Sequence, residues 1–235
     1  MMTRFLSIEQ GTPAWIAARR GAITASRIKD VMAVLRNGGE SEARAKYKLE
    51  LIAERISGIT TEHYVSPDML RGTELEPIAR AEYEITSGNV VDQVGFAIHS
   101  DIPTSGASPD GIIGDHGSIE IKVPRVHNHL RWLIGGIVPP EHQMQCLWVM
   151  NCCDCQWIDF ISFCPELPDG LRLFVVRMNR DDARIQQIEA EVIKFESEIE
   201  AVIADLSQRV KTEPVEQAPE DMSSWAAAFG EEIVI

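Results

Sequence analysis

The chain lacks the features of a membrane-bound, secreted or disulfide-stabilised protein. Its sequence contains no apolar run of ~18 residues, the length that a helix needs to cross a bilayer. The N-terminal segment has no long apolar stretch of the kind found in a secretory signal. Cysteine occurs only five times, and Cys152, Cys153 and Cys155 crowd together without the spacing of a disulfide framework or a four-cysteine metal site. We therefore expect a cytoplasmic protein that makes no membrane contact.

Positive charge is also scarce. The 22 Lys and Arg residues are outnumbered by 36 Asp and Glu residues, which gives a net charge of −14. Nucleic-acid affinity usually depends on basic surface that releases counterions, so this balance counts against a protein that binds nucleic acid. However, the C-terminal third carries much of the acid, whereas residues 122–131 and the pair Arg19–Arg20 are locally basic. A basic channel in an acidic protein is compatible with this distribution.

The order of sequence patterns predicts one folded domain over residues 1–208. Helices are expected within residues 12–56, a core of helices and short strands at 70–178, and a long amphipathic helix at 180–208. This order predicts an α/β (α+β) fold with a central mixed β-sheet flanked by helices. Residues 209–235 are acidic and contain proline, which is typical of a disordered tail. The tail carries Trp225 and Phe229 at helical spacing, either without a role or as a docking peptide for a partner.

Several finer expectations concern the core. A helix is expected to begin after Ser26, which would be its N-cap. Residues 59–70 are expected to form a loop, and a helix should follow at 73–87 with Leu75, Ile78 and Tyr83 on its buried side. The expected strands lie at residues 90–99, 111–113, 118–123, 156–163 and 171–178.

The most informative motif is S-P-D-G at residues 108–111, followed by an acid and a lysine two residues apart. Alternation in residues 118–123 predicts a half-buried strand with Glu120 and Lys122 on its polar face. Asp110 and Glu120 could bind a hard cation such as Mg²⁺, which polarises a phosphodiester and activates water. Lys122 could orient that water or offset charge on the phosphate. An E-x-K tripeptide is common on solvated strand faces, but its combination with S-P-D-G favours a metal-dependent nuclease site.

Further fragments follow in a fixed order along the chain. They are W-x-x-x-R-x-G-x-I-T-A-S at 15–26, G-T-E-L-E-P-I-A-R at 72–80, T-S-G at 86–88, and Q-M-Q with Trp148 at 143–148. Together with S-P-D-G and E-I-K, they resemble the lambda-exonuclease or YqaJ-type viral recombinase family of the PD-(D/E)xK nuclease superfamily. The resemblance runs from about residue 9 to about residue 178. It implies a core like that of restriction endonucleases.

The resemblance implies a role for each matching residue. Asp110 and Glu120 match metal-binding carboxylates, and Lys122 matches the lysine that helps to activate water. Glu76 matches an acid that the family places beside the metals, and the backbone carbonyl of Ile121 is implied as a further metal ligand. A carboxylate in the first turn of a helix, where we expect Glu76, is also favoured by the helix dipole without any metal.

Arg19 and Ser26 match residues that in this family hold the 5′-phosphate of DNA. Ser26 at the start of a helix would offer its hydroxyl and backbone N–H groups to an anion, and Arg19 adds a fork of donors. As isolated residues they would equally well be a helix cap and a surface arginine. Further candidate DNA-binding residues are Thr24, Arg125 and Gln143.

The chain departs from the family pattern at the glutamine expected in the active site. In the family an apolar residue stands four positions after the second glutamine of Q-x-Q, whereas Trp148 follows Gln145 by three. Either Gln143 or Gln145 can therefore be the active-site residue, and we favour Gln145. The neighbouring His142 is expected to be a surface histidine that could touch DNA.

The resemblance implies a Mg²⁺-dependent exonuclease, with Mn²⁺ as the alternative ion, that degrades linear double-stranded DNA from 5′-phosphorylated ends. It would act in phage-type recombination by single-strand annealing, in the cytoplasm of a bacterial host. A homotrimer and a single-strand annealing protein as partner are implied in the same way. The alternatives are a PD-(D/E)xK endonuclease or exonuclease of other polarity, a non-catalytic DNA-binding or assembly module, and a small-molecule metallohydrolase.

Overall fold

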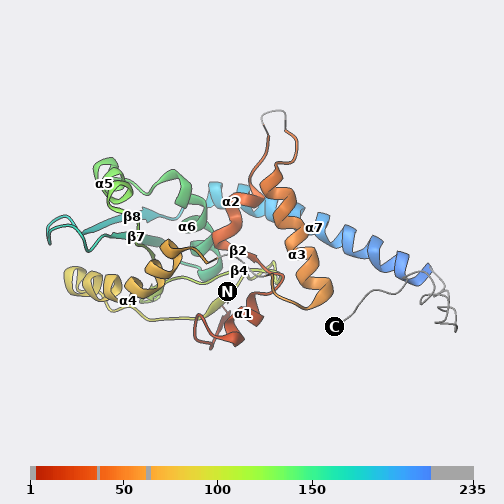
Figure 1. Cartoon of the computed structure of the whole chain (residues 1–235), viewed down its shortest axis with the longest axis horizontal. Coiled ribbons are helices and arrows are strands. Elements are labelled where there is room, and N and C mark those ends of the chain that lie inside the picture. Colours follow the sequence, from red (N-terminus) through yellow and green to blue (C-terminus); the bar gives the residue numbers. More distant parts are fainter. Residues whose placement is uncertain (1–3, 36–37, 62–64, 213–235) are drawn as a thin grey trace, which may run out of the picture.

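The structure is a computed structural model that describes residues 4–35, 38–61 and 65–212. Its strands form two four-stranded mixed sheets, and helices lie against both (Figure 1). The mixed α/β architecture expected from the sequence is confirmed, and a second sheet is added to it. Within the described residues, no helix combines the length and the apolar character needed to span a bilayer.

The first sheet is built from very short strands that come from distant parts of the chain. Its order is β1-β3-β4-β2, and only β2 and β4 run parallel. The strands are β1 (Arg4–Leu6), β2 (Ile23–Thr24), β3 (Phe96–Ile98) and β4 (Ser105–Ala107). The strand expected at 90–99 is reduced to β3. The other three were missed because strands of two or three residues show no period-2 alternation.

The second sheet follows the predicted strands closely. Its order is β5-β6-β7-β8, with β6 and β7 parallel and the outer pairs antiparallel. The strands are β5 (Gly111–Ile113), β6 (Gly117–Lys122), β7 (Trp157–Phe163) and β8 (Leu173–Asn179). Because β5 and β6 contain the D-G and E-I-K parts of the motif, this sheet carries the candidate metal ligands.

Strand β6 is buried on both faces, so the prediction of a half-buried strand is wrong. Ile119 and Ile121 pack beneath helix α4 (Pro67–Ser87), as the alternation indicated. The other face, however, is largely covered by helix α6 (Pro140–Cys153), and only the last residue of the strand, Lys122, is partly exposed. Glu120 is consequently only 1% exposed. A carboxylate held this deep in the protein needs hydrogen-bonding or charged partners.

Helix α6 is the central helix of the fold. It contacts β3 and β4 of the first sheet and β6 and β7 of the second. Its Trp148 is fully buried, donates its indole N–H to Ser105 Oγ at 3.1 Å and stacks on His99. All five cysteines are free and buried, and three of them, Cys146, Cys152 and Cys153, belong to α6. Residues 146–150 of α6 are apolar and buried on every side of the helix, which is typical of the interior of a protein.

Helix α4 begins at Pro67, within the segment that was expected to be a loop. Ser66 caps it by accepting the Met69 N–H, and the helix continues through Pro77. Glu76 therefore lies in the third turn, so the helix dipole does not explain it, and Ile78 is exposed where burial was predicted. Gly72 and Pro77 made residue 73 resemble a helix start, because both are unfavourable inside a helix.

Ser26 does not cap a helix, in contrast to the prediction. A 3₁₀ turn η1 (Ala25–Arg27) precedes the short helix α2 (Ile28–Val31), and Ser26 lies inside the turn. The backbone before the turn is fixed by tertiary contact, because the Thr24 N–H donates to the Tyr47 hydroxyl at 3.1 Å. The capping pattern was therefore overridden by a contact far away in the sequence.

The remaining helices agree with the sequence patterns. They are α1 (Pro13–Arg19), α3 (Glu42–Ser57), α5 (Val126–Gly135) and α7 (Asp182–Thr212). Helix α7 extends four residues past the expected end at 208, and Figure 1 shows it running along α3 and beyond it. The rest of the expected disordered tail, with Trp225 and Phe229, lies outside the described residues.

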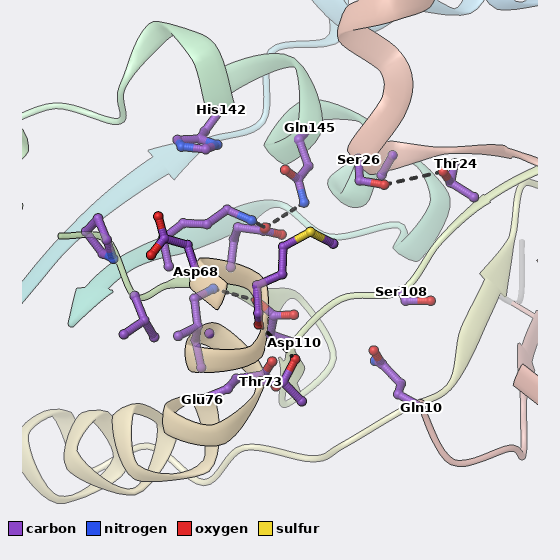
Figure 2. Close-up of a pocket in the computed structure, with 18 of the residues that line it drawn as sticks. Gln10, Thr24, Ser26, Asp68, Thr73, Glu76, Ser108, Asp110, His142 and Gln145 are labelled. Atoms are coloured by element: carbon purple, nitrogen blue, oxygen red, sulfur yellow. Dashed lines mark hydrogen bonds and ion pairs between the residues drawn. The ribbon is translucent and has the colours of Figure 1, made fainter. Parts of the chain in front are cut away.

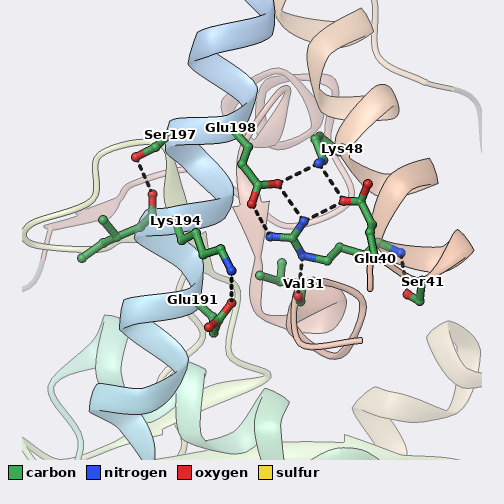
Figure 3. Close-up of polar contacts among 10 residues, drawn as sticks. Val31, Glu40, Ser41, Lys48, Glu191, Lys194, Ser197 and Glu198 are labelled. Atoms are coloured by element: carbon green, nitrogen blue, oxygen red, sulfur yellow. Dashed lines mark hydrogen bonds and ion pairs between the residues drawn. The ribbon is translucent and has the colours of Figure 1, made fainter. Parts of the chain in front are cut away.

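A network of ion pairs joins α3 to α7 (Figure 3). The Arg44 guanidinium, with 6% of its side chain exposed, donates to the two carboxylate oxygens of Glu198 at 2.7 and 3.0 Å. Lys48 binds the same carboxylate at 2.7 Å. These partners, Arg44 before Lys48, lower the pKa of Glu198 to about 2. Glu198 therefore stays ionised in the folded protein at all ordinary pH values.

Helix α3, which these ion pairs join to α7, also fixes the segment before η1. Arg55, which pairs with Glu196 of α7 at 2.7 Å, donates its Nε–H to the Gly21 carbonyl at 2.8 Å. Glu54 accepts the Gly21 N–H at 2.6 Å. Gly21 has a φ of 68°, and an added Cβ would lie 2.7 Å from the Arg55 side chain. Glycine is therefore required at the point where α1 turns towards β2 and η1.

The contribution of the ion-pair network between α3 and α7 to stability can be tested with Glu198→Gln. We expect the free energy of unfolding at pH 7 to fall by about 2 kcal/mol, because Arg44 loses a charged acceptor. With a pKa of about 2 in the fold, against ~4.3 in an unfolded chain, the contribution is complete above about pH 5. It should be lost as the pH falls from about 4 towards 2. Urea denaturation measures both effects.

The matched control is Glu191→Gln, which removes an exposed α7 carboxylate 3.9 Å from Lys194. That substitution should change the free energy of unfolding by less than about 0.5 kcal/mol. Equal losses of unfolding free energy in the two variants would contradict a specific stabilising role of the ion pairs at Glu198.

Candidate active site

One cavity of about 530 Å³ brings together most of the predicted site residues (Figure 2). Its wall is formed by η1 and the end of α1, by α4, by the loop before β5, and by β6 and α6. The predicted residues that line it are Arg19, Thr24, Ser26, Glu76, Asp110, Glu120, Ile121, Lys122 and Gln145. Segments separated by more than a hundred residues therefore meet at a single cavity.

Glu120 is the central carboxylate of the cavity. Its Oε1 accepts hydrogen bonds from Lys122 Nζ and Gln145 Nε2, each at 2.5 Å. Its Oε2 is buried and has no hydrogen-bond partner in the part of the chain that the structure describes. Burial lowers the pKa of Lys122, but the carboxylates of Glu120 and Asp110 outweigh this and raise it above its ordinary value. Lys122 is therefore held as a cation that can donate hydrogen bonds.

Asp110 faces β6 from the preceding loop. Its Oδ2 accepts the Ile121 N–H at 2.6 Å. Strand β5 pairs with β6 only as far as Ile119, so the Asp110 carboxylate takes the place of a strand partner at Ile121. Burial raises the pKa of Asp110 well above its usual value, and the charges of Glu120 and then Glu76 add to this effect. Burial is also the largest cause of the raised pKa of Glu76. Crowded carboxylates with raised pKa values mark a place that favours a bound cation.

The other end of the cavity offers donors suited to an anion. The Arg19 guanidinium lies 3.9 Å from the centre of the Trp15 ring, and no ion pair joins it to a carboxylate of the described residues. Trp15 donates its indole N–H to Ser108 Oγ at 2.9 Å. The hydroxyls of Thr24 and Ser26 lie 3.4 Å apart, as Figure 2 shows. A guanidinium and neighbouring hydroxyls are the groups that bind phosphate.

Two predicted residues lie outside the cavity wall. The Gln143 amide donates to the Val138 carbonyl at 2.9 Å and accepts from Arg184 at 3.1 Å, so its hydrogen-bonding groups are used elsewhere. Arg125 is half exposed and pairs with Asp68, whose side chain does line the cavity. Of the two candidate glutamines, the structure thus brings Gln145 into the cavity.

Several other residues lining the cavity were not assigned to the site from the sequence. Gln10 donates to the carbonyls of Val94 and Pro109, and so holds the loop that carries Asp110. His142 is partly buried against Phe160 and is not a simple surface histidine. Burial lowers its pKa to about 4, so the ring is neutral near pH 7. No local pattern marks these residues, because only the tertiary fold brings them to the cavity.

The donor set fits a hard divalent cation, although it is not a complete metal cage. Among the described residues, no three His, Cys, Asp or Glu side chains converge closely enough to form a full ligand group. The unpartnered Glu120 Oε2 and the Asp110 carboxylate nevertheless line the same cavity. Mg²⁺ is usually held by one or two carboxylates with water completing its shell, which these two oxygen donors can satisfy.

Comparison with known proteins agrees with the fold. Residues 14–156 match the YqaJ-like viral recombinase domain family. Structures of the alkaline exonuclease LHK-Exo from Laribacter hongkongensis, one in complex with dAMP, are 42% identical in sequence and cover 85% of this chain and 98% of their own, with a TM-score of 0.79. A phage-related exonuclease from Haemophilus somnus 129PT covers 79% of this chain and 96% of its own, with 16% identity and a TM-score of 0.59, and so shares the fold. No curated protein matches the chain.

A mixed sheet that presents an aspartate, a glutamate and a lysine to one cavity defines a nuclease-type fold of the PD-(D/E)xK class. The family match covers well over half of the sequence. The chain belongs to the YqaJ-like viral recombinase domain family.

The electrostatic strain at Asp110 predicts a stabilising substitution. Asp110→Asn keeps an acceptor for the Ile121 N–H and removes the repelled charge, so it should raise stability by about 1 kcal/mol, or about 2–4 °C in Tm. The raised pKa means that the fold is favoured while Asp110 is protonated and loses stability as the pH rises through that pKa. The gain should therefore be absent near pH 4, below which Asp is protonated in both states, and grow with pH.

Thermal denaturation between pH 5 and pH 8.5 measures the gain, with Asp115→Asn on an exposed turn as the control. A variant that is no more stable than the parent at high pH would refute the charge crowding at Asp110.

Proposed function

We propose that this protein is a divalent-metal-dependent exonuclease that degrades linear double-stranded DNA from 5′-phosphorylated ends, in the 5′ to 3′ direction. The observation that carries the proposal is that one cavity combines carboxylates and a lysine at one end with a guanidinium and hydroxyls at the other. The family and the 42% identity to an alkaline exonuclease support nuclease activity on DNA. Phage-type recombination by single-strand annealing, in the cytoplasm of a bacterial host, is the setting that fits this family.

The carboxylate end of the cavity would hold the metal. Asp110 and Glu120 are the proposed ligands, joined by the Ile121 carbonyl and by Glu76 after side-chain rotation. Mg²⁺ is the proposed ion and Mn²⁺ the alternative, since both accept oxygen ligands. When bound, such an ion polarises the phosphodiester and lowers the pKa of water.

The remaining residues would position the reacting groups. Lys122, held as a cation by its neighbours, offsets charge that develops on the phosphate and orients the attacking water through a hydrogen bond. Gln145 holds one oxygen of Glu120, so the other oxygen, which accepts no hydrogen bond from the described residues, would be available to a metal ion. The chain thus supplies orientation and charge without a side chain that must act as a base.

The donor end of the cavity would bind the terminal phosphate. A guanidinium binds a phosphate through two parallel hydrogen bonds, and the Ser26 and Thr24 hydroxyls can add further contacts to the Arg19 fork. A terminal phosphate differs from an internal one because it is not continued by another nucleotide. Anchoring it next to the metal ligands would therefore select a chain end and release nucleotides from that end.

The proposal extends to assembly and partners. By resemblance, we propose a homotrimer and cooperation with a single-strand annealing protein. Arg125 at the rim of the cavity is a proposed contact to the DNA backbone, whereas Gln143, bound to Val138 and Arg184, fits a structural role better.

The activity itself is tested by digestion of linear duplex DNA with 5′-phosphate or 5′-hydroxyl ends and of closed circular DNA. We expect Mg²⁺-dependent loss of the 5′-phosphorylated linear form, abolished by EDTA. Lys122→Ala should reduce the rate by at least about 100-fold, because the charge and the hydrogen bond to the nucleophile are both lost. The control Lys194→Ala, on the exposed face of α7, should leave it unchanged. Cutting of circular DNA would indicate an endonuclease, and DNA binding without turnover would indicate an assembly module.

Recognition of the end is tested by Arg19→Gln. We expect kcat/KM on 5′-phosphorylated DNA to fall by about 10- to 100-fold, the loss of one or two charge-assisted hydrogen bonds. Activity on 5′-hydroxyl DNA should change little, so the preference between the two ends should disappear. Arg20→Gln is the matched control, since Arg20 is exposed and donates to Thr60. An unchanged preference in Arg19→Gln would refute the phosphate role.

A further inference from the structure

A buried arginine lies beneath the carboxylates of the cavity and has no role in the scheme above. Arg80 follows Glu76 by one turn of α4 and is only 8% exposed. Its Nη2–H donates to Glu76 Oε1, and its Nε–H donates to the backbone carbonyl of Asp110 at 3.2 Å. One guanidinium thus connects Glu76 and Asp110, two of the acidic residues that line the cavity.

The contacts of Arg80 matter because the cavity gathers several negative charges. Apart from the exposed Asp68, three carboxylates line the cavity and act on one another, those of Glu76, Asp110 and Glu120. Two of them have a cation of their own, since Lys122 pairs with Glu120 and Arg80 pairs with Glu76. The two cations approach from different elements, β6 and α4. Without Arg80, the α4 side of the cluster would hold a carboxylate with no counter-charge beside two others.

A second cavity of about 820 Å³ is also lined by Glu76, Arg80 and Asp110. The side chain of Glu76, which is 35% exposed, borders both cavities and is therefore only partly enclosed by packing. The hydrogen bonds from the buried Arg80 are the contacts that orient Glu76 and the Asp110 carbonyl on this side.

We propose that Arg80 is a positioning residue, which fixes Glu76 and the Asp110 main chain in the arrangement from which the carboxylates bind the divalent cation. This inference rests on the proposed metal-dependent function and names a residue that prepares the same site. The fork geometry of arginine is essential, because two donors on one rigid plane reach a carboxylate and a carbonyl at once. Lysine could keep the charge but not both contacts.

The experiment measures cation binding by the full-length protein without DNA, by titration calorimetry with Mn²⁺ and Mg²⁺. Arg80→Met should weaken binding by about 10- to 100-fold, as is typical when the partner of a metal ligand is removed. Arg80→Lys and Arg80→Gln should each recover only part of the loss, since the first keeps the charge and the second keeps a donor. Thermal denaturation of each variant reports whether it is folded.

The matched control is Arg177→Met in β8. Arg177 pairs with the buried Asp159 at 2.8 Å, away from the cavity, so its loss should lower stability and leave cation affinity unchanged. A folded Arg80→Met variant with the affinity of the parent would overturn the proposal. If Arg80→Met does not fold, parental affinity in both Arg80→Lys and Arg80→Gln would overturn it equally. Absence of cation binding by the parent protein would instead refute the proposed metal site itself.

Discussion

The ion pair between Glu120 and Lys122 is the interaction on which the site depends. A carboxylate that is almost completely buried is tolerated because a lysine two residues along the same strand and an amide from α6 both bind its Oε1. That arrangement needs β6 to be extended, α6 to cover it, and the parallel pairing of β6 with β7 to hold both. Among the described residues, the second oxygen of Glu120 has no hydrogen-bond partner and can therefore accept a ligand.

The residues close together in the sequence could be predicted, and those that depend on tertiary structure could not. Asp110, Glu120 and Lys122 lie in one hairpin whose loop and strand have clear local signals, so their meeting follows from short-range geometry. Glu76 was placed in the first turn of a helix because Gly72 and Pro77 imitate a helix start. Ser26 was taken for a helix cap because the hydroxyl of Tyr47, which fixes the backbone there, is 23 residues away from Thr24. In the sequence, Glu76 and Arg80 resemble an ordinary i,i+4 ion pair on a helix surface.

Part of the negative charge of the chain is explained by ion pairs between helices. On α7, Glu196 and Glu198 are bound by Arg55, Arg44 and Lys48 of α3, so part of the acidic excess serves to fasten two helices together. The same pairs occupy basic residues that could otherwise bind a DNA backbone. Arg19, which no described carboxylate pairs with, retains its charge for an anion. This distribution of charge is compatible with the proposal that Arg19 binds a terminal phosphate, since it leaves a single guanidinium at the cavity free of ion pairs with described carboxylates.

The two ends of the cavity are built by different parts of the fold, and α6 sets the distance between them. The end of the cavity with Thr24 and Ser26 rests on α1, η1 and the first sheet, and α3 holds it through hydrogen bonds to Gly21 and Thr24. The end with Asp110 and Glu120 rests on α4 and the second sheet. Helix α6 contacts both sheets and η1, and its Gln145 lines the same cavity. Since a terminal phosphate and the scissile bond are separated by one nucleotide, the step of the proposed enzyme would be fixed by how rigidly this buried helix holds the two halves of the cavity apart.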